Sequence, residues 1–241
     1  MGVSANHSEG LPARLHSETG IRSEEVEKLR AKLRQMERGF HGEVRSRNCV
    51  SSGVSALDDL LPDQGFVKGT LCEWISAELG GGAASLAMRV ASQAAIDGPL
   101  IVVDRNRSFY APAMDLAGGN LRNTIFVRPE SRVDELWALE QCLRCPGVAA
   151  VLCQIDFLKT QEFRRLQLAV ASGAALGILI RSAVAKTRTG WADVRLLVSP
   201  RPSVEFLRRL EVRCVYAKGH FSDRSVELTL CEETGELREA S

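Results

Sequence analysis

Three consecutive glycines, Gly80, Gly81 and Gly82, form the segment of this sequence that is best suited to bind an anion. They lie between an apolar run and an alanine-rich segment with helical character, so a helix is expected to begin directly after them. The backbone N–H groups and the dipole at the start of such a helix can bind a phosphate group. The alternative is a tight turn from a strand to a helix that binds nothing, and we prefer this interpretation.

Cys142 and Cys145 have the spacing of a redox or zinc-binding pair. No second pair and no nearby histidine completes a zinc site, and the 4 histidines lack the spacing of metal ligands. We therefore predict no metal, and we expect both thiols at the end of a helix that stops at Pro146. The 7 cysteines are an odd number, and several, such as Cys153, lie within apolar runs. This usage is typical of small buried side chains in a reducing compartment.

The composition is that of an ordinary globular protein. The 241 residues include 31 Lys and Arg against 30 Asp and Glu, and 45% of the residues are apolar. The net charge of +1 excludes a generally basic nucleic-acid coat protein, and the apolar content is sufficient for a real core. The sequence has neither an apolar stretch of about 18 residues nor a secretory signal, so we expect a cytoplasmic protein without a membrane partner.

The N-terminal residues are expected to lie outside the main domain. Residues 1–20 are polar and lack periodicity, and we predict that they are disordered. Residues 21–48 are predicted to form a helix followed by a polar linker. The helix carries one apolar stripe, which consists of Val26, Leu29, Leu33 and Met36. This stripe either docks on the protein's own domain or binds a partner, and the sequence favours neither.

From residue 50 onward, short apolar runs alternate with helical patterns. The predicted strands are residues 70–75, 100–104, 124–127, 149–155 and 176–181. The predicted helices are residues 84–96, 111–117, 133–145 and 160–172. Nearly continuous apolar strands that alternate with helices are typical of a parallel sheet with both faces covered.

After residue 181 the helical patterns stop. The predicted strands there are residues 194–198, 209–217 and 225–230. Turn residues such as Pro200-Arg201-Pro202 separate them, which suggests an antiparallel extension of the sheet. The main domain is therefore expected to cover residues 49–231, followed by an acidic C-terminal tail at residues 232–241.

Basic residues are concentrated near this extension. Residues 181–224 contain 10 Lys and Arg against 4 Asp and Glu. This block could contact phosphates or an acidic partner. Because charged and apolar residues alternate at residues 209–213, we prefer the interpretation that the basic side chains lie on the solvent face of strands.

Residues 52–61 and 65–75 resemble the opening of the RecA-type recombinase core. Residues 80–87 fall where this family has its phosphate-binding loop. The resemblance extends over residues ~50 to ~200. It implies an α/β fold with a RecA-like P-loop NTPase core, in which the sheet is mainly parallel. The predicted antiparallel C-terminal strands and the N-terminal helix would be added to that core.

The residues that perform phosphoryl transfer in the RecA-type family are replaced in this sequence. Ala83 stands at the position of the lysine that contacts the phosphates. Ala84 stands where a hydroxyl binds magnesium, and Ser85 comes one residue late. After Asp104, Asn106 occupies the place of the catalytic glutamate, and an amide cannot act as a general base.

The magnesium-side aspartate of the family falls on Gln154 or Asp156, depending on the register. Phosphoryl transfer depends on positioned charge, so we predict little or no ATPase activity, no catalytic residues and no cofactor. A degenerate nucleotide site would consist of Gly80, Gly81, Gly82, Ala83, Ala84, Ser85 and Asp104. Whether ATP binds there is left open.

The two long loops with which recombinases bind single-stranded DNA are also missing. Asp156 leads almost directly into the helix that starts at Thr160, and residues 184–191 form only a brief connection. Lys186 and Arg188 could still contact a phosphate. We therefore expect any DNA contact to be indirect or weak.

Four runs are similar to the ImuA group of proteins, which are degenerate relatives of RecA that also resemble the SulA cell-division inhibitors. These runs are residues 137–145, 148–152, 163–169 and 174–181. The resemblance implies a non-catalytic accessory of SOS mutagenesis, that is, of damage-induced translesion DNA synthesis. The implied partners are RecA, an inactive Y-family polymerase homologue and an error-prone replicative-type polymerase.

RecA-type subunits dock on their neighbours through an N-terminal helix and the following segment. This placement motivates the hypothesis that the predicted N-terminal helix mimics such a subunit and contacts RecA, beside the equally open alternative that it docks on its own domain. Two other functions stay open: a weak ATPase of the recombinase superfamily and a SulA-type inhibitor of cell division.

The three tryptophans are assigned packing roles. Trp74 and Trp137 are predicted to lie in the core. Trp191 is predicted to pack at the start of a strand rather than to stack on a base.

Overall fold

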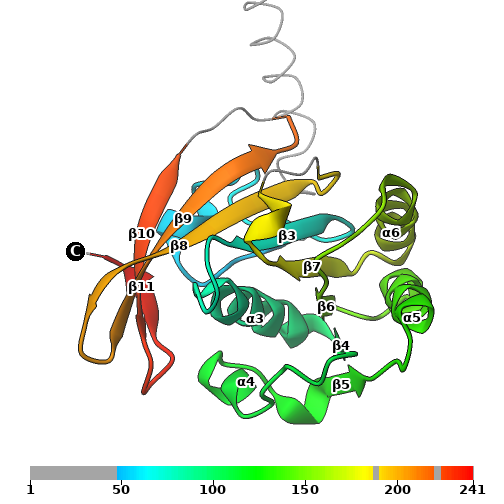
Figure 1. Cartoon of the computed structure of the whole chain (residues 1–241), viewed down its shortest axis with the longest axis horizontal. Helices are drawn as coiled ribbons and strands as arrows, with labels where there is room; N and C mark the ends of the chain where they lie inside the picture. Colours follow the sequence, from blue (N-terminus) through cyan, green and yellow to red (C-terminus); the bar gives the residue numbers. More distant parts are fainter. Residues whose placement is uncertain (1–47, 187–189, 220–223, 241) are drawn as a thin grey trace, which may run out of the picture. The chain divides into compact units, whose positions relative to one another are not determined.

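The predicted strands assemble into one nine-stranded sheet in the computed structural model, which describes residues 48–186, 190–219 and 224–240 (Figure 1). The predicted disordered segment at residues 1–20, the predicted helix with its apolar stripe and almost all of the linker lie outside the described residues.

The strand order places the parallel strands together and the antiparallel strands at one side. Across the sheet the strands are β11 (Leu237–Glu239), β10 (Ser225–Cys231), β9 (Leu207–Ala217), β8 (Val194–Val204), β3 (Leu71–Ser76), β7 (Leu176–Arg181), β6 (Ala150–Gln154), β4 (Leu100–Val103) and β5 (Thr124–Val127). The strands from β8 to β5 are parallel, and β9, β10 and β11 continue the sheet in antiparallel fashion. The prediction of an α/β fold with a mainly parallel sheet and antiparallel C-terminal strands is confirmed.

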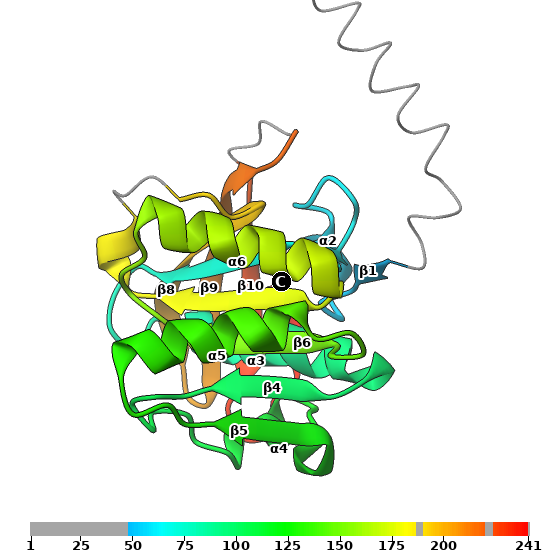
Figure 2. The same cartoon turned by 90° about the vertical axis from the view of Figure 1, so that its right-hand side faces the viewer.

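Helices cover both faces of the parallel strands (Figure 2). One face carries α3 (Ala83–Ala94) and the short α4 (Ala113–Leu116), and the other carries α5 (Arg132–Arg144) and α6 (Thr160–Gly173). The smaller elements are α2 (Ser55–Asp58), the 3-10 turns η1 (Ala95–Asp97), η2 (Leu121–Asn123) and η3 (Ala183–Ala185), and a separate hairpin of β1 (Cys49–Val50) and β2 (Phe66–Val67).

Local signals in the sequence define where the two outer helices begin. At the start of α5, the Ser131 hydroxyl accepts a hydrogen bond from the Asp134 N–H at 3.1 Å. At the start of α6, the Glu162 carboxylate accepts one from the Lys159 N–H at 2.8 Å. Such caps satisfy N–H groups that have no partner within the helix.

The apolar strands bury side chains on both faces of the sheet, as their nearly continuous apolar sequences predict. On the α3 face, Trp74 is fully buried, as expected, and stacks on Phe66 with ring centroids 5.7 Å apart. On the other face, Val151 and Leu179 belong to the cluster that α5 and α6 cover. Each such aliphatic side chain contributes about 1.5–3 kcal/mol by its burial.

One buried ion-pair cluster interrupts the apolar packing at the centre of the sheet. Glu73 of β3 is fully buried and bonds to Arg181 of β7 and to Arg195 of β8, with 2.6 Å between Arg195 Nε and Glu73 Oε2. Arg181 also donates to the Asp156 carbonyl at 2.7 Å, and its guanidinium lies 5.6 Å from the Phe163 ring centroid. The cluster therefore connects the central strands to the segment before α6.

The predicted basic block is largely neutralised by partners within the domain. On the uncovered face of the antiparallel strands, Arg201 and Arg209 pair with Glu211 and Glu227, at 2.8 and 2.7 Å respectively. Arg213 lies 3.5 Å from the other oxygen of Glu211. Basic side chains on the solvent face of strands, as we preferred, therefore account for much of the block.

Two boundaries differ from the predicted ones by more than two residues. β8 continues through Pro200 and Pro202, which we had assigned to a turn. Its pairing with β3 ends at Val198, so among the described strands only β9 neighbours the prolines, and a missing N–H is tolerated there. The segment expected to be an acidic tail contributes β11, which pairs with β10 and completes the sheet.

The prediction for Trp137 is wrong. Its side chain is 61% exposed on α5, because the buried side of this helix is formed by residues such as Leu139 and Leu143. Trp191 lies before β8 and is half exposed, and its carbonyl accepts a hydrogen bond from the Gln167 side chain.

The cysteines differ in their exposure. Cys72, Cys153 and Cys214 are buried, as expected, and burial raises the pKa of the Cys72 thiol to about 12. Cys145 follows the last residue of α5 and is exposed, which confirms the predicted helix end.

Within the described ranges, no group of three His, Cys, Asp or Glu side chains could hold a metal ion. No helix of the described residues is both long enough and apolar enough to cross a membrane.

We predict that Glu73→Gln destabilises the fold strongly. The substitution leaves the buried Arg181 and the largely buried Arg195 without their shared carboxylate, and breaking such a pair costs about 3–5 kcal/mol. Urea unfolding measures the loss. Glu227→Gln, on the exposed face of the antiparallel strands, is the control and should cost less than about 1 kcal/mol. Equal small losses for both variants would contradict the assigned role of Glu73.

Cys231 is predicted to react with iodoacetamide at unusually low pH. A hydrogen bond from the Thr234 side chain lowers the pKa of this thiol, and the thiolate is the reactive form. Thr234→Val should raise the pKa and move the midpoint of the alkylation rate to higher pH. Mass spectrometry of the same digest should find Cys72 unmodified and the rate at the exposed Cys145 unchanged. An unaltered Cys231 profile in the variant would refute the prediction.

Candidate functional site at the carboxyl edge of the sheet

The triglycine segment forms the turn between β3 and α3. Gly80 and Gly82 have left-handed backbone angles, with φ of 72° and 89°, and Gly82 is the residue before the first turn of α3. The Gly81 N–H donates to the Glu78 carbonyl at 3.1 Å. The turn from strand to helix that we preferred is therefore present. Gly80 and Gly82 supply the left-handed backbone angles that it needs and that other residues rarely adopt.

Two side chains of the antiparallel strand β9 pack against this turn. A Cβ atom on Gly82 would lie 2.6 Å from Cδ2 of Leu210, and Arg208 donates a hydrogen bond of 2.5 Å to the Gly80 carbonyl. Arg208 also lies 3.5 Å from the Glu232 carboxylate. The space next to Gly82 is therefore filled by a side chain of the same chain.

The three residues after the glycines do not reproduce a phosphate-binding arrangement. Ala83 is buried in the core cluster on the α3 face, so its side chain points away from the carboxyl edge. Ala84 is exposed, and Ser85 is partly exposed; both line the groove in front of the turn. A side chain at position 83 is thus directed into the domain rather than toward a ligand.

Asp104 organises its own loop. Its buried carboxylate accepts hydrogen bonds from the backbone N–H groups of Ser108, at 2.8 Å, and Phe109, at 3.3 Å. The Ser108 hydroxyl lies 3.3 Å from both the Asp104 carboxylate and the Gln154 side-chain carbonyl. The structure therefore places Asp104 beside the edge of the sheet, where its carboxylate is already occupied.

The two alternatives for the magnesium-side acid have different positions. Gln154 is the last residue of β6 and lines the groove. Asp156 follows, and its carboxylate accepts a hydrogen bond from the Ser182 N–H at 2.7 Å. The residue at the strand end is therefore the neutral amide, and the acid binds the adjacent backbone.

These elements surround a groove of about 430 Å³ at the carboxyl ends of β3, β6 and β7. Its apolar lining includes Ile180, Val184 and Leu79, and Leu79 is fully exposed at the tip of the turn. Its two guanidinium groups, from Arg181 and Arg208, already bond to groups within the domain. Such a surface is suited to an apolar segment rather than to a triphosphate.

The structure brings together most of the predicted nucleotide-site residues but gives them other partners. Gly80, Gly82, Ala84 and Ser85 line the groove. Gly81 lies against Ser76, where a Cβ atom would approach the Ser76 hydroxyl to 2.9 Å. The predicted partner stripe of the N-terminal helix lies outside the described residues.

Sequence reasoning missed the residues that make the border of the groove apolar and that pack on the glycine turn. Leu79 is an aliphatic residue next to a glycine turn, which is a signal of exposure that could have been used. Arg208 and Leu210 lie 128 or more residues beyond Gly80, and nothing local indicates that β9 packs on the turn.

No protein-family model matches this chain, and no curated protein sequence matches it. The resemblances to the RecA-type and ImuA proteins therefore rest on the sequence runs themselves.

We predict that Gly82→Ala is more destabilising than Gly80→Ala. Both substitutions place a Cβ atom on a left-handed residue, which costs about 1–2 kcal/mol, but only position 82 adds a collision, with Leu210. The collision should cost about 1–3 kcal/mol more in thermal or urea unfolding.

Leu210→Ala tests whether the collision causes the larger loss of stability in Gly82→Ala. In a double-mutant cycle this substitution should recover part of the loss from Gly82→Ala, because it removes the atoms that collide. Equal losses at the two glycines, without coupling to position 210, would rule out the packing explanation.

Proposed function

We propose that this chain is a non-catalytic, RecA-like accessory protein of damage-induced translesion DNA synthesis. In this proposal it holds components of an error-prone polymerase near RecA on damaged DNA. The observation that carries the non-catalytic part is the triglycine turn, which β9 closes through Leu210 and Arg208 and in which position 83 faces the core. The cellular role is supported by the resemblance of α5, β6, α6 and β7 to the ImuA group.

Several features of the site support the absence of phosphoryl transfer. That reaction needs a cation, a magnesium-binding hydroxyl and a base in fixed positions. The corresponding residues are a buried alanine, an exposed alanine and the exposed Asn106, while Asp104 is bound to its own loop. The arginines near the turn are used internally and replace none of these groups.

The groove supports a role in binding protein partners. A fully exposed leucine and a half-exposed valine border an apolar depression, and such surfaces commonly bind apolar segments of other proteins. We propose that Leu79 and Val184 contact an apolar segment of a polymerase component. The neutralised basic block supports the expectation that contact with DNA is indirect or weak.

Calorimetric titration with magnesium-ATP tests the non-catalytic part of the proposal. We expect no saturable heat and no phosphate release. Ala83→Lys/Ala84→Thr, which restores the residue types of a phosphate loop, should destabilise the fold rather than create binding, because position 83 is buried in an apolar cluster. Tight binding with turnover in the unaltered chain would overturn the proposal in favour of a weak ATPase.

The cellular role is tested by damage-induced mutation frequency in a strain that lacks this protein. The unaltered chain should restore induced mutants, and Leu79→Asp/Val184→Asp should not. Leu168→Asp on α6, which is 63% exposed, is the matched control and should restore them. These substitutions are on the surface and should change stability by about 0.5 kcal/mol or less. An unchanged mutation frequency in the deletion strain would remove the proposed function.

A further inference from the structure

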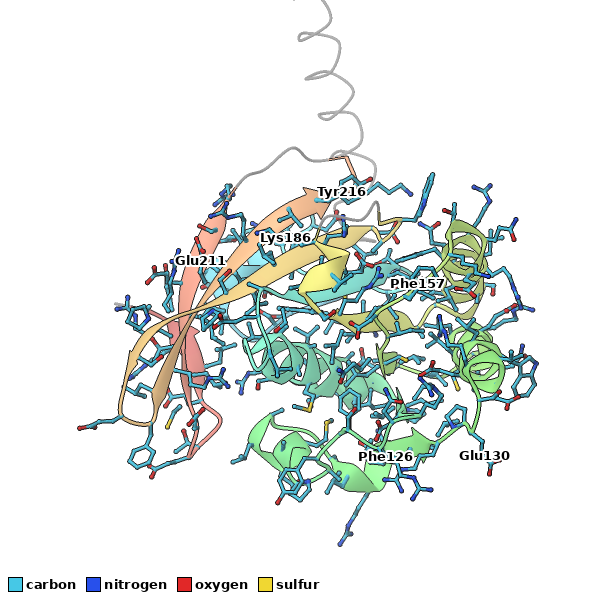
Figure 3. All side chains as sticks on the ribbon, in the orientation of Figure 1. Phe126, Glu130, Phe157, Lys186, Glu211 and Tyr216 are labelled. Atoms are coloured by element: carbon cyan, nitrogen blue, oxygen red, sulfur yellow. The ribbon has the colours of Figure 1, made fainter. Side chains whose placement is uncertain are left out.

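A pocket of about 210 Å³ lies between α3, α4 and the turn that joins β10 to β11. The turn is packed on α4, since a Cβ atom on Gly235 would collide with the Leu116 carbonyl. It is also bound to α3, because Arg89 donates a hydrogen bond of 3.0 Å to the Gly235 carbonyl. In Figure 3 this turn lies far from Phe157, which is on the α6 side of the molecule. Three elements that are distant in the sequence therefore fix the walls of the pocket.

Most of the wall is apolar. Leu86 and Met88 of α3 contribute from the core, and Leu230 contributes from β10. Leu116 of α4 is 45% exposed and lies in the same wall. An apolar cavity of about 150 Å³ is sufficient for benzene, so this pocket has room for a hydrocarbon chain of about eight carbons.

The charged side chains of the pocket are two arginines and one glutamate, namely Arg89, Arg208 and Glu232. Arg208 Nε lies 3.5 Å from the Glu232 carboxylate, so these two charges offset each other. Arg89 pairs with no carboxylate among the described residues, and its Nε is buried without a hydrogen-bond partner. The pocket therefore contains one positive charge that no described group neutralises. A guanidinium group that is partly removed from water is stabilised by an anion, and a carboxylate matches its planar geometry.

We propose that this pocket binds a small apolar monocarboxylic acid, with its carboxylate paired to Arg89 and its hydrocarbon part between α3 and α4. One negative charge balances the one unpaired cation. A phosphate dianion is disfavoured, because its strong hydration opposes entry among aliphatic side chains. A neutral apolar molecule is disfavoured as well, because it leaves the Arg89 guanidinium without an acceptor.

The pocket differs from the groove at the carboxyl edge of the sheet. The two share Ser85 and Arg208 in their walls, but Leu79 and Val184 line only the groove. The inference therefore does not rest on the proposed function. The Leu79→Asp/Val184→Asp variant should bind the acid like the unaltered chain, so the two proposals can fail separately.

Calorimetric titration of the full chain with sodium octanoate tests the proposal. We expect saturable binding that is about tenfold or more tighter than the binding of octan-1-ol, which has the same chain length without the charge. Arg89→Met removes the charge and keeps an aliphatic side chain. It should weaken octanoate about tenfold or more and leave octanol nearly unchanged. Arg164→Met, at an exposed arginine of α6 outside the pocket, is the matched control and should change neither affinity.

Protection of Cys231 gives a second readout, which needs no substitution. This residue lines the pocket, so octanoate should slow its reaction with iodoacetamide, as measured by mass spectrometry. The rate at Cys145, which lies outside the pocket, should not change. Circular dichroism verifies that each variant is folded. No saturable binding, equal affinity for octanoate and octanol, or undiminished protection of Cys231 in Arg89→Met would each overturn the proposal.

Discussion

The buried carboxylate of Glu73 is the constraint on which the centre of this fold depends. A charged group without water is stable only when opposite charges and hydrogen bonds surround it, and here β7 and β8 each supply an arginine. Parallel strands of aliphatic residues have little besides packing to fix their alignment. The carboxylate meets both guanidinium groups in one alignment of the three strands, so we infer that it specifies their register.

The same two arginines also bind segments of the chain that lie outside the strands. Arg181 bonds to the Asp156 carbonyl before α6, and Arg195 donates to the Ala185 carbonyl of η3 at 2.8 Å. Gly190 lies so close that a Cβ atom there would be 2.6 Å from Arg195 Nε. Two described residues of the connection between β7 and β8, Ala185 and Gly190, therefore lie against the cluster.

The sequence predicted the layers of the fold better than the contacts of the site. Periodicity located the four main helices and the strands, and β5 and β7 have the predicted bounds, because burial on one or both faces dictates a local pattern. The exposure of Trp137 was missed because a large aromatic residue was assigned to the core without a test of which helix face it occupies. The continuation of β8 through its prolines depends on where β3 stops, which is information from another strand.

From the sequence, we could predict which groups the candidate site lacks but not which contacts form it. The types of residues 83, 84 and 106 predict the absence of phosphoryl transfer without any knowledge of the fold. The positive features, a turn closed by Leu210 and an apolar groove bordered by Leu79, arise from contacts between distant segments. Local sequence carries no record of such contacts, since alternation shows which side chains of β9 face inward but not what they touch.

The contact between Arg208 and Gly80 also bears on how the protein is made. These residues are 128 positions apart, so the strand that closes the turn is synthesised well after the turn itself. Contacts of such long range form late, because the intervening chain must first be ordered. During synthesis the parallel strands and their helices can assemble while the turn before α3 still lacks β9. The surface at the carboxyl edge therefore reaches its final form only after β9 has been synthesised.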